Sequence, residues 1–194
     1  MEEYLARSAS GQASRRPLVT LSRLLLKNRS HRGYDPRFIV REDQLRRIIG
    51  VNTRIPSARN QQVLRFRPVL ADEAPGVLAE IRLGGALPEL HLPLPGTGPN
   101  AFIIVCSTVP EDRYVDIDLG ISVQSMLLQA AEIGLNYSLA ILAFLYLPLL
   151  ILAIGKGIEK IELVEISEND DHRYFRKDGI HYVPKVRVED LIIG

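Results

Sequence analysis

The sequence predicts an α+β protein, because helical patterns come first and strand patterns follow in irregular alternation with helices. Two helical stretches, residues 18–28 and 42–50, precede every strand-like stretch. The sequence contains neither a glycine-rich dinucleotide fingerprint after a strand nor a phosphate loop of the Walker type. This order favours α+β over a strictly alternating parallel fold, and any bound phosphate must be held by side chains.

Hydrophobic spacing predicts the two N-terminal helices. Leucines within residues 18–28 recur at the i, i+3 and i+4 spacing of one helix face. Residues 42–50 begin with Glu42 and Asp43, which suit a first helical turn because negative side chains interact favourably with the helix dipole there.

The middle of the chain predicts strands separated by a helix and a long loop. Residues 66–70 form a short strand candidate, and residues 71–81 form a short helix candidate that Pro75 limits. Residues 84–100 are rich in glycine and proline, which indicates a loop or extended arm. Residues 101–107 are continuously apolar and of strand length, so we expect a strand covered on both faces.

A long helix follows. Asp116 and Asp118 are expected to open it, and Gly134 is expected to end it. Apolar residues cover a wide part of its surface, so the helix should be central and packed on more than one side.

An uncharged run over residues 139–154 raises the question of a membrane span. It is 16 residues long and is divided by Pro148, whereas a spanning helix needs ~20 apolar residues. We therefore expect two buried pieces, a turn or short helix before Pro148 and a strand over residues 149–154.

The C-terminal part predicts one strand and mostly irregular structure. Residues 160–166 alternate apolar and charged side chains, as in a half-exposed strand. Residues 168–181 are polar and indicate a surface loop, and residues 182–193 form a short, mixed tail. Residues 1–17 lack the order of a secretory signal, so we expect a loose arm before a single domain of residues 18–194.

Composition excludes few classes of protein. The net charge is +1, yet residues 1–67 hold 15 Lys and Arg against 5 Asp and Glu, while residues 68–194 hold 9 against 18. The basic part could meet nucleic acid, an acidic partner or a phosphorylated ligand. The single cysteine, Cys106, lies in an apolar run, and the histidines show no metal-ligand spacing. We expect a cytoplasmic protein without a metal site or a membrane segment.

Two short polar runs carry the strongest chemical signal. The first, residues 29–32, reads Arg-Ser-His-Arg and offers fixed positive charges and a hydroxyl, which suit a phosphate. The second, residues 56–62, reads Pro-Ser-Ala-Arg-Asn-Gln-Gln and offers carboxamides in a turn, which suit a polyhydroxylated ligand. Flavin mononucleotide (FMN) has both chemical features. Alternatively, the first run could be a solvated helix end and the second an ordinary turn.

These runs resemble the flavin-binding signature of the FMN-dependent nitroreductase family. Other segments are similar to that family in order and spacing: the helix 118–134 with the turn after it, the strand 149–154 with Gly155-Lys156, and Lys185-x-Arg187 after Pro184. The likeness extends over residues 20–190, nearly the whole chain.

The resemblance implies a central mixed sheet flanked by helices and an intertwined homodimer with one FMN at each of two sites in the dimer interface. It also implies electron transfer from NAD(P)H through FMN to a small acceptor such as a nitroaromatic or a quinone. The implied cofactor-binding residues are Arg29, Ser30, His31, Arg32, Pro56, Ser57, Asn60, Gln62, Leu142, Ala143, Gly155, Lys156, Lys185 and Arg187.

The resemblance divides these residues by role. The side chains expected at the phosphate and the nearby flavin edge are Arg29, Ser30, Arg32, Lys185 and Arg187. Ser57, Asn60 and Gln62 are expected to face the ring and ribityl chain from the other subunit, and backbone near Leu142-Ala143 to approach flavin N5. No catalytic side chain is expected, because the flavin supplies the chemistry.

The chain departs from the family pattern after the second run. Val63 and Leu64 stand where a proline and an aromatic residue are usual, and the turn after the long helix is apolar. Two alternatives to the oxidoreductase therefore stay open. One is a flavin-binding or redox-sensing module without turnover, and the other is an anion or nucleic-acid binder that uses the basic first third.

Overall fold

The centre of the protein is a four-stranded sheet with strand order β1-β2-β4-β3. A computed structural model describes residues 19–81, 83, 92–140 and 148–192, so the expected arm 1–17 lies outside it. All three pairings in this sheet are antiparallel. Its strands are β1 (Leu64–Val69), β2 (Ala101–Ser107), β3 (Asn136–Ala140) and β4 (Pro148–Gly155).

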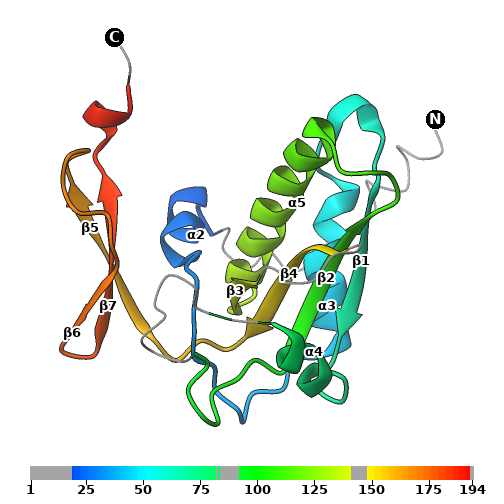
Figure 1. The fold of residues 1–194 in the computed structure, drawn as a ribbon, viewed down its shortest axis with the longest axis horizontal. Helices are drawn as coiled ribbons and strands as arrows, with labels where there is room; N and C mark the ends of the chain where they lie inside the picture. The colour runs from blue at the N-terminus through cyan, green and yellow to red at the C-terminus, as the bar shows by residue number, and fades with distance from the viewer. Residues whose placement is uncertain (1–18, 82, 84–91, 141–147, 193–194) are drawn as a thin grey trace.

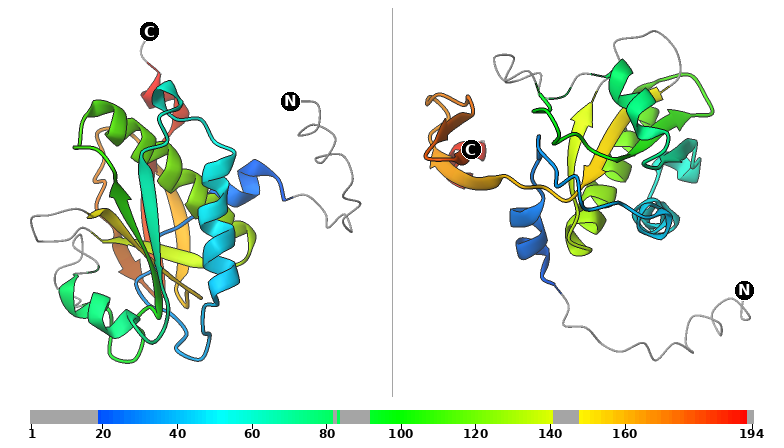
Figure 2. Two further views of the ribbon diagram at one scale, coloured as in Figure 1. Left: turned by 90° about the vertical axis from the view of Figure 1, so that its right-hand side faces the viewer. Right: turned by 90° about the horizontal axis from the view of Figure 1, so that it is seen from below.

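Helices cover both faces of this sheet, which confirms the α+β class (Figure 2). Ile103 on one face of β2 packs in a core with residues of the helices α3 (Glu42–Ile49) and α5 (Arg113–Glu132). The neighbouring Phe102 points to the other face and packs in a core with residues of α4 (Ala74–Glu80). The prediction that residues 101–107 form a strand covered on both faces is confirmed.

The long helix α5 begins earlier than expected. Asp112 caps it, because its carboxylate accepts hydrogen bonds from the backbone N–H of Tyr114 at 2.9 Å and of Val115 at 2.8 Å. Asp118 is therefore not at the helix start but in its second turn, where it is buried. The expectation that Asp116 and Asp118 open the helix was wrong, because the helix begins before them, directly after its N-cap Asp112.

Replacing Asp112 by alanine should lower the free energy of unfolding by about 1 kcal/mol, because two N–H groups at the helix start lose their acceptor. Urea unfolding followed by circular dichroism measures this. Glu111→Ala is the matched control, since it removes an adjacent exposed carboxylate that makes no capping bond to α5. Equal stability of Asp112→Ala and Glu111→Ala would contradict the cap.

A second, three-stranded sheet follows along the chain and stands at one end of the molecule, beyond the helix α2 (Leu21–Lys27) (Figure 1). The strand β5 (Lys160–Ile166) pairs in parallel with β7 (Ile180–Val186), and β6 (Phe175–Lys177) pairs antiparallel with β7. The strand expected at 160–166 is confirmed. The expected surface loop is confirmed for residues 168–174, but its remainder was wrong, because β6 and β7 form a hairpin that continues into the tail.

The four strands of the central sheet pair antiparallel. A single parallel bridge, between Ser30 and Tyr137, extends this sheet beyond β3 and gives it the mixed character that was expected. The first polar run therefore lies along the edge of the central sheet.

The short connecting elements complete the chain. Residues 50–53 and 58–60 are 3-10 helices (η1, Gly50–Thr53, and η2, Ala58–Asn60), and η4 (Val188–Leu191) follows β7. The helix α2 has no buried residue, although its leucines show helical spacing.

The apolar run 139–154 was expected to form a turn or short helix before Pro148 and a strand after it. The strand is confirmed, since residues 149–154 lie in β4, but the first two residues of the run end β3 instead. Residues 141–147 lie outside the described part of the chain. Among the described residues, no helix has the length and apolar character needed to cross a bilayer.

Candidate functional site

The first polar run is held against the edge of the central sheet. The backbone N–H of His31 donates to the carbonyl of Tyr137 in β3 at 2.7 Å. The Asn136 side chain donates to His31 Nε2 at 3.0 Å and accepts from the backbone N–H of Gly157 at 3.0 Å. The run therefore keeps one conformation beside the ends of β3 and β4.

Two glycines after β4 allow this close packing. A Cβ added to Gly157 would collide with the His31 ring, and one added to Gly155 would lie 2.5 Å from Cδ1 of Tyr34. Gly155 was predicted as a cofactor residue, and the structure shows that its lack of a side chain is needed for packing.

A cavity of about 350 Å³ opens beside the first run. We call it the α2–β3 cavity, and its lining residues are Leu26, Lys27, Arg29, His31, Ala131, Gly134, Leu135, Asn136, Lys156, Glu159 and Ile161. Three of these are cations and one is a carboxylate. The Nε of Arg29 is buried and has no hydrogen-bond partner in the described part of the chain. The Nη2 of the same side chain donates to the carbonyl of Leu25. A cavity with excess positive charge suits an anion such as a phosphate.

Arg32 has its partners inside the protein. Its Nη1 donates to His181 Nε2 at 3.2 Å, and the guanidinium lies 5.2 Å from the centroid of the Tyr174 ring. Its backbone N–H donates to the Glu159 carboxylate, which also accepts from Arg176. Arg32 thus joins the first run to the C-terminal sheet, a role that the sequence did not predict.

Both histidines in this region favour the neutral form. Burial is the largest cause, and it lowers the pKa of His181 to about 4, with Arg32 and Arg176 acting in the same direction and Glu159 opposing them. Burial also lowers the pKa of His31, which Glu159 partly counters. A neutral His181 can accept the hydrogen bond from Arg32, which a protonated ring could not.

Of the two C-terminal cations, Lys185 lies on the same strand as His181 and Arg187 follows that strand. Lys185 is four residues further along β7, about 13 Å at the usual strand rise, and on the same face of the strand. Its side chain is exposed. Arg187 follows the strand and forms an ion pair with Asp190 at 2.9 Å. Neither residue lines the α2–β3 cavity.

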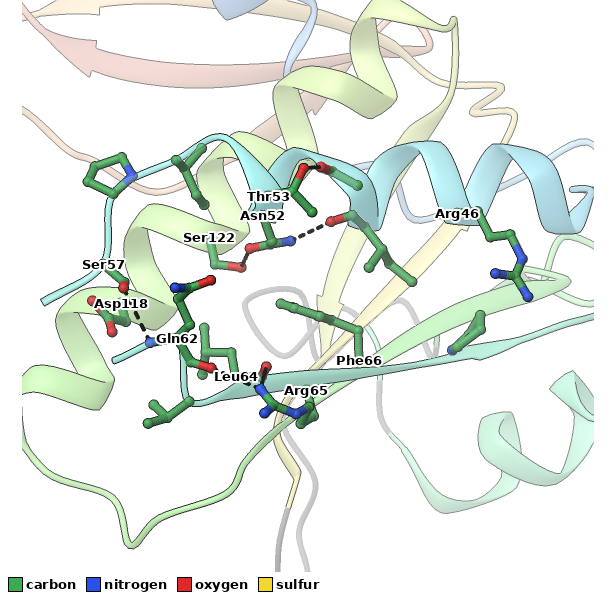
Figure 3. Close-up of a pocket in the computed structure, with 16 residues that line it drawn as sticks. Arg46, Asn52, Thr53, Ser57, Gln62, Leu64, Arg65, Phe66, Asp118 and Ser122 are labelled. Carbon is green, nitrogen blue, oxygen red and sulfur yellow. Dashed lines mark hydrogen bonds between the residues drawn. The ribbon is translucent and has the colours of Figure 1, made fainter. Parts of the chain in front are cut away.

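The second polar run lies in a different place and borders a larger cavity, of about 580 Å³, between α3 and β1 (Figure 3). We call it the α3–β1 cavity, and the members of the run that line it are Pro56, Ser57 and Gln62. Asn60 is not among the lining residues, and its side-chain oxygen accepts from Gln62 Nε2 at 3.1 Å. The two cavities share no lining residue, so the structure of one chain does not bring the two runs together.

Sequence reasoning missed the buried polar residues of the α3–β1 cavity. Asp118 is 3% exposed and its Oδ1 accepts from the backbone N–H of Ala58 at 2.6 Å. Ser122, one helical turn further along α5, donates to Asn52 at 2.5 Å. The sequence did contain a pattern that indicates their burial. Val115, Asp118 and Ser122 follow the helical spacing of a single buried stripe.

Part of the positive charge in the first third is paired. Ion pairs engage five of the 12 Lys and Arg in the described residues 19–67, namely Arg37–Asp35, Arg41–Asp43, Arg46–Glu42, Arg47–Glu132 and Arg67–Glu73. Pairing weakens the field of these five arginines, and the nucleic-acid binder stays an untested alternative. The predicted residues Leu142 and Ala143 lie outside the described part of the chain.

Comparisons with known proteins place this fold. No protein-family model and no curated protein sequence matches the chain. Solved structures do match. A nitroreductase family protein from Clostridium difficile 630 is 21% identical with a TM-score of 0.53, and the match covers 73% of this chain and 86% of that one.

Two further matching structures are of proteins described with FMN, one as a complex and one as an FMN-dependent enzyme. A nitroreductase-like protein from Desulfovibrio desulfuricans in complex with FMN is 20% identical with a TM-score of 0.57, covering 75% of this chain and 89% of that one. A variant of NfnB, an FMN and NADPH-dependent nitroreductase derived from Sphigopyxis sp. strain HMH, is 17% identical with a TM-score of 0.56, covering 72% and 89%. At these identities the likeness concerns the fold, and we conclude that this chain has the fold of the nitroreductase family.

Proposed function

We propose that the protein is an FMN-dependent oxidoreductase that passes reducing equivalents from NAD(P)H to a small organic acceptor, such as a nitroaromatic or a quinone. The observation that carries the proposal is the α2–β3 cavity, which Lys27, Arg29 and Lys156 line with excess positive charge, together with an Arg29 Nε that is buried and has no hydrogen-bond partner among the described residues. The FMN complex and the FMN and NADPH dependence described for two proteins of this fold support it.

The residues present fit a phosphorylated flavin. Arg29 and Lys156 line the cavity and offer charge-assisted donors to a phosphate. Ser30 follows Arg29 in the chain and is not among the lining residues. We propose that Lys185 and Arg187 complete the phosphate site, and that Arg32 contributes by holding β7 through His181. When bound, FMN would supply hydride transfer between NAD(P)H and the acceptor.

We propose a homodimer as the form that binds FMN, with Ser57, Asn60 and Gln62 of a second subunit facing the cofactor. Two observations support this. The two polar runs border separate cavities within one chain, so one cofactor could contact both only across subunits. In addition, Leu21 and Leu26 of α2 and Leu191 near the C-terminus are each more than 60% exposed, as expected for a surface that a partner covers.

The visible spectrum of the purified protein tests this function directly. We expect a yellow protein with bound FMN that bleaches when NADPH or NADH is added without oxygen, and steady NAD(P)H oxidation with a quinone or nitroaromatic acceptor. A colourless protein that takes up no FMN would overturn the proposal. Bound FMN without any NAD(P)H oxidation would instead identify a flavin-binding module.

The double substitution Arg29→Ala with Arg187→Ala tests the phosphate site. Loss of two charge-assisted contacts should weaken FMN binding by about 100-fold, or about 2.7 kcal/mol, with the circular dichroism spectrum unchanged. Quenching of FMN fluorescence measures the affinity. The control is Arg37→Ala with Arg173→Ala, which removes the same charge from side chains that are 89% and 88% exposed. Wild-type affinity in the first variant would show that the phosphate lies elsewhere.

A further inference from the structure

The second polar run has an unusual backbone. Arg59, Asn60 and Gln62 all adopt left-handed conformations, with φ of 53°, 54° and 48°. This region of conformational space is unfavourable for side chains other than glycine, with asparagine the most tolerant. Such a turn persists only when surrounding contacts hold it.

One of those contacts comes from a distant part of the chain. Asp118, 60 residues away in α5, accepts a hydrogen bond from the backbone N–H of Ala58 at 2.6 Å. Within the turn, Ser57 Oγ accepts from the backbone N–H of Gln62 at 3.3 Å. The turn also contacts a residue outside it, because the Arg59 guanidinium lies 4.7 Å from the centroid of the Tyr114 ring. Asp118 is buried, whereas the Arg59 contact is at the surface. Water therefore competes least with the hydrogen bond from Ala58 to Asp118.

If residue 118 served only to pack the helix, an aspartate would be an unfavourable choice. A buried carboxylate loses its hydration, and its Oδ2 has no hydrogen-bond partner in the described part of the chain. An apolar side chain would suit the buried stripe of α5 better. It would, however, leave the N–H of Ala58 without its acceptor.

We infer that Asp118 is a positioning residue for the cofactor site, because it holds Ala58 and so keeps the 57–62 turn in the conformation that presents Ser57, Asn60 and Gln62. The inference rests on the proposed function, in which these three side chains face the flavin. A turn that is ordered before binding avoids the loss of affinity that comes from ordering it on binding.

Three variants separate this role from general stability. Asp118→Ala removes the acceptor, Asp118→Asn keeps a carbonyl oxygen that can accept from Ala58, and Asp116→Ala removes an exposed carboxylate from the same helix. Two measurements apply to each. Hydrogen exchange of a peptide spanning residues 55–63 reports on the turn in the protein without cofactor, and quenching of FMN fluorescence reports on affinity.

We expect faster exchange in this peptide and about tenfold weaker FMN binding for Asp118→Ala. Asp118→Asn should stay within about threefold of the wild type, since it preserves the hydrogen bond, and Asp116→Ala should match the wild type. The inference is overturned if folded Asp118→Ala keeps wild-type affinity or wild-type exchange, or if Asp118→Asn loses as much affinity as Asp118→Ala.

Failure of the proposed function looks different. If the wild-type protein binds no FMN, both the function and the positioning role are overturned. If the wild type binds FMN and Asp118→Ala binds it equally well, only the positioning role is overturned. If Asp118→Ala does not fold, hydrogen exchange of the Ala58 amide in the wild type tests the inference instead. Protection supports the inference, and exchange as fast as in an unstructured peptide overturns it.

Discussion

Gly155→Ala should lower the free energy of unfolding by about 3 kcal/mol, because the new methyl group collides with a ring that cannot move. The added Cβ would lie 2.5 Å from Cδ1 of Tyr34 and 3.0 Å from its Cγ. Tyr34 is 1% exposed, and its hydroxyl donates to the carbonyl of His31 at 3.0 Å. Its backbone N–H donates to the carbonyl of Thr97 at 2.9 Å, so both ends of the residue are held.

Urea unfolding of the protein without cofactor measures this effect, which keeps it separate from flavin binding. Gly120→Ala is the matched control, since no atom lies within 4 Å of a Cβ added there in the middle of α5. Alanine favours a helix interior over glycine, so the control should be unchanged or more stable by about 0.5–1 kcal/mol. If Gly155→Ala were as stable as the wild type, the packing of Tyr34 against the end of β4 would be wrong.

Acid should destabilise the protein by about 3 kcal/mol between neutral pH and pH 4 through His181. The pKa of His181 is about 4 in the folded chain against 6.5 in the unfolded one, chiefly because the ring is buried. Between these values the unfolded chain binds more protons, so stability is complete above pH 6.5 and is lost as the pH falls towards 4. His31, whose pKa burial also lowers, acts in the same direction.

The groups that face His181 modify this effect of burial. Arg32, Arg176 and His31 oppose a positive charge on the ring, Glu159 favours it, and the Tyr174 ring lies 5.4 Å away. Urea unfolding at pH 7 and pH 4.5 should show a loss of about 2 kcal/mol or more in the wild type, and a smaller loss in His181→Gln. The exposed His172 supplies the control His172→Gln, which should keep the wild-type pH dependence. An unchanged pH dependence in His181→Gln would contradict the assignment to this histidine.

These contacts also show which features could be predicted from the sequence. The helix at residues 42–49, the doubly buried strand at 101–107 and the strand after Pro148 were predicted well, because hydrophobic spacing and strand length are local properties. The start of α5 was misplaced because two acidic residues resembled a helix start, while Asp112 provided the real cap.

The sequence by itself determined the α+β class and most helices and strands, and it pointed to the two polar runs as candidate binding segments. Only the tertiary structure decided which contacts the polar residues of the first run and of α5 make. Arg29 lines the α2–β3 cavity, whereas Arg32 donates to His181, 149 residues away, and Asp118 accepts from Ala58, 60 residues away. Hydrogen bonds between distant segments form only when the chain has folded, so local patterns cannot separate a binding residue from a buried anchor.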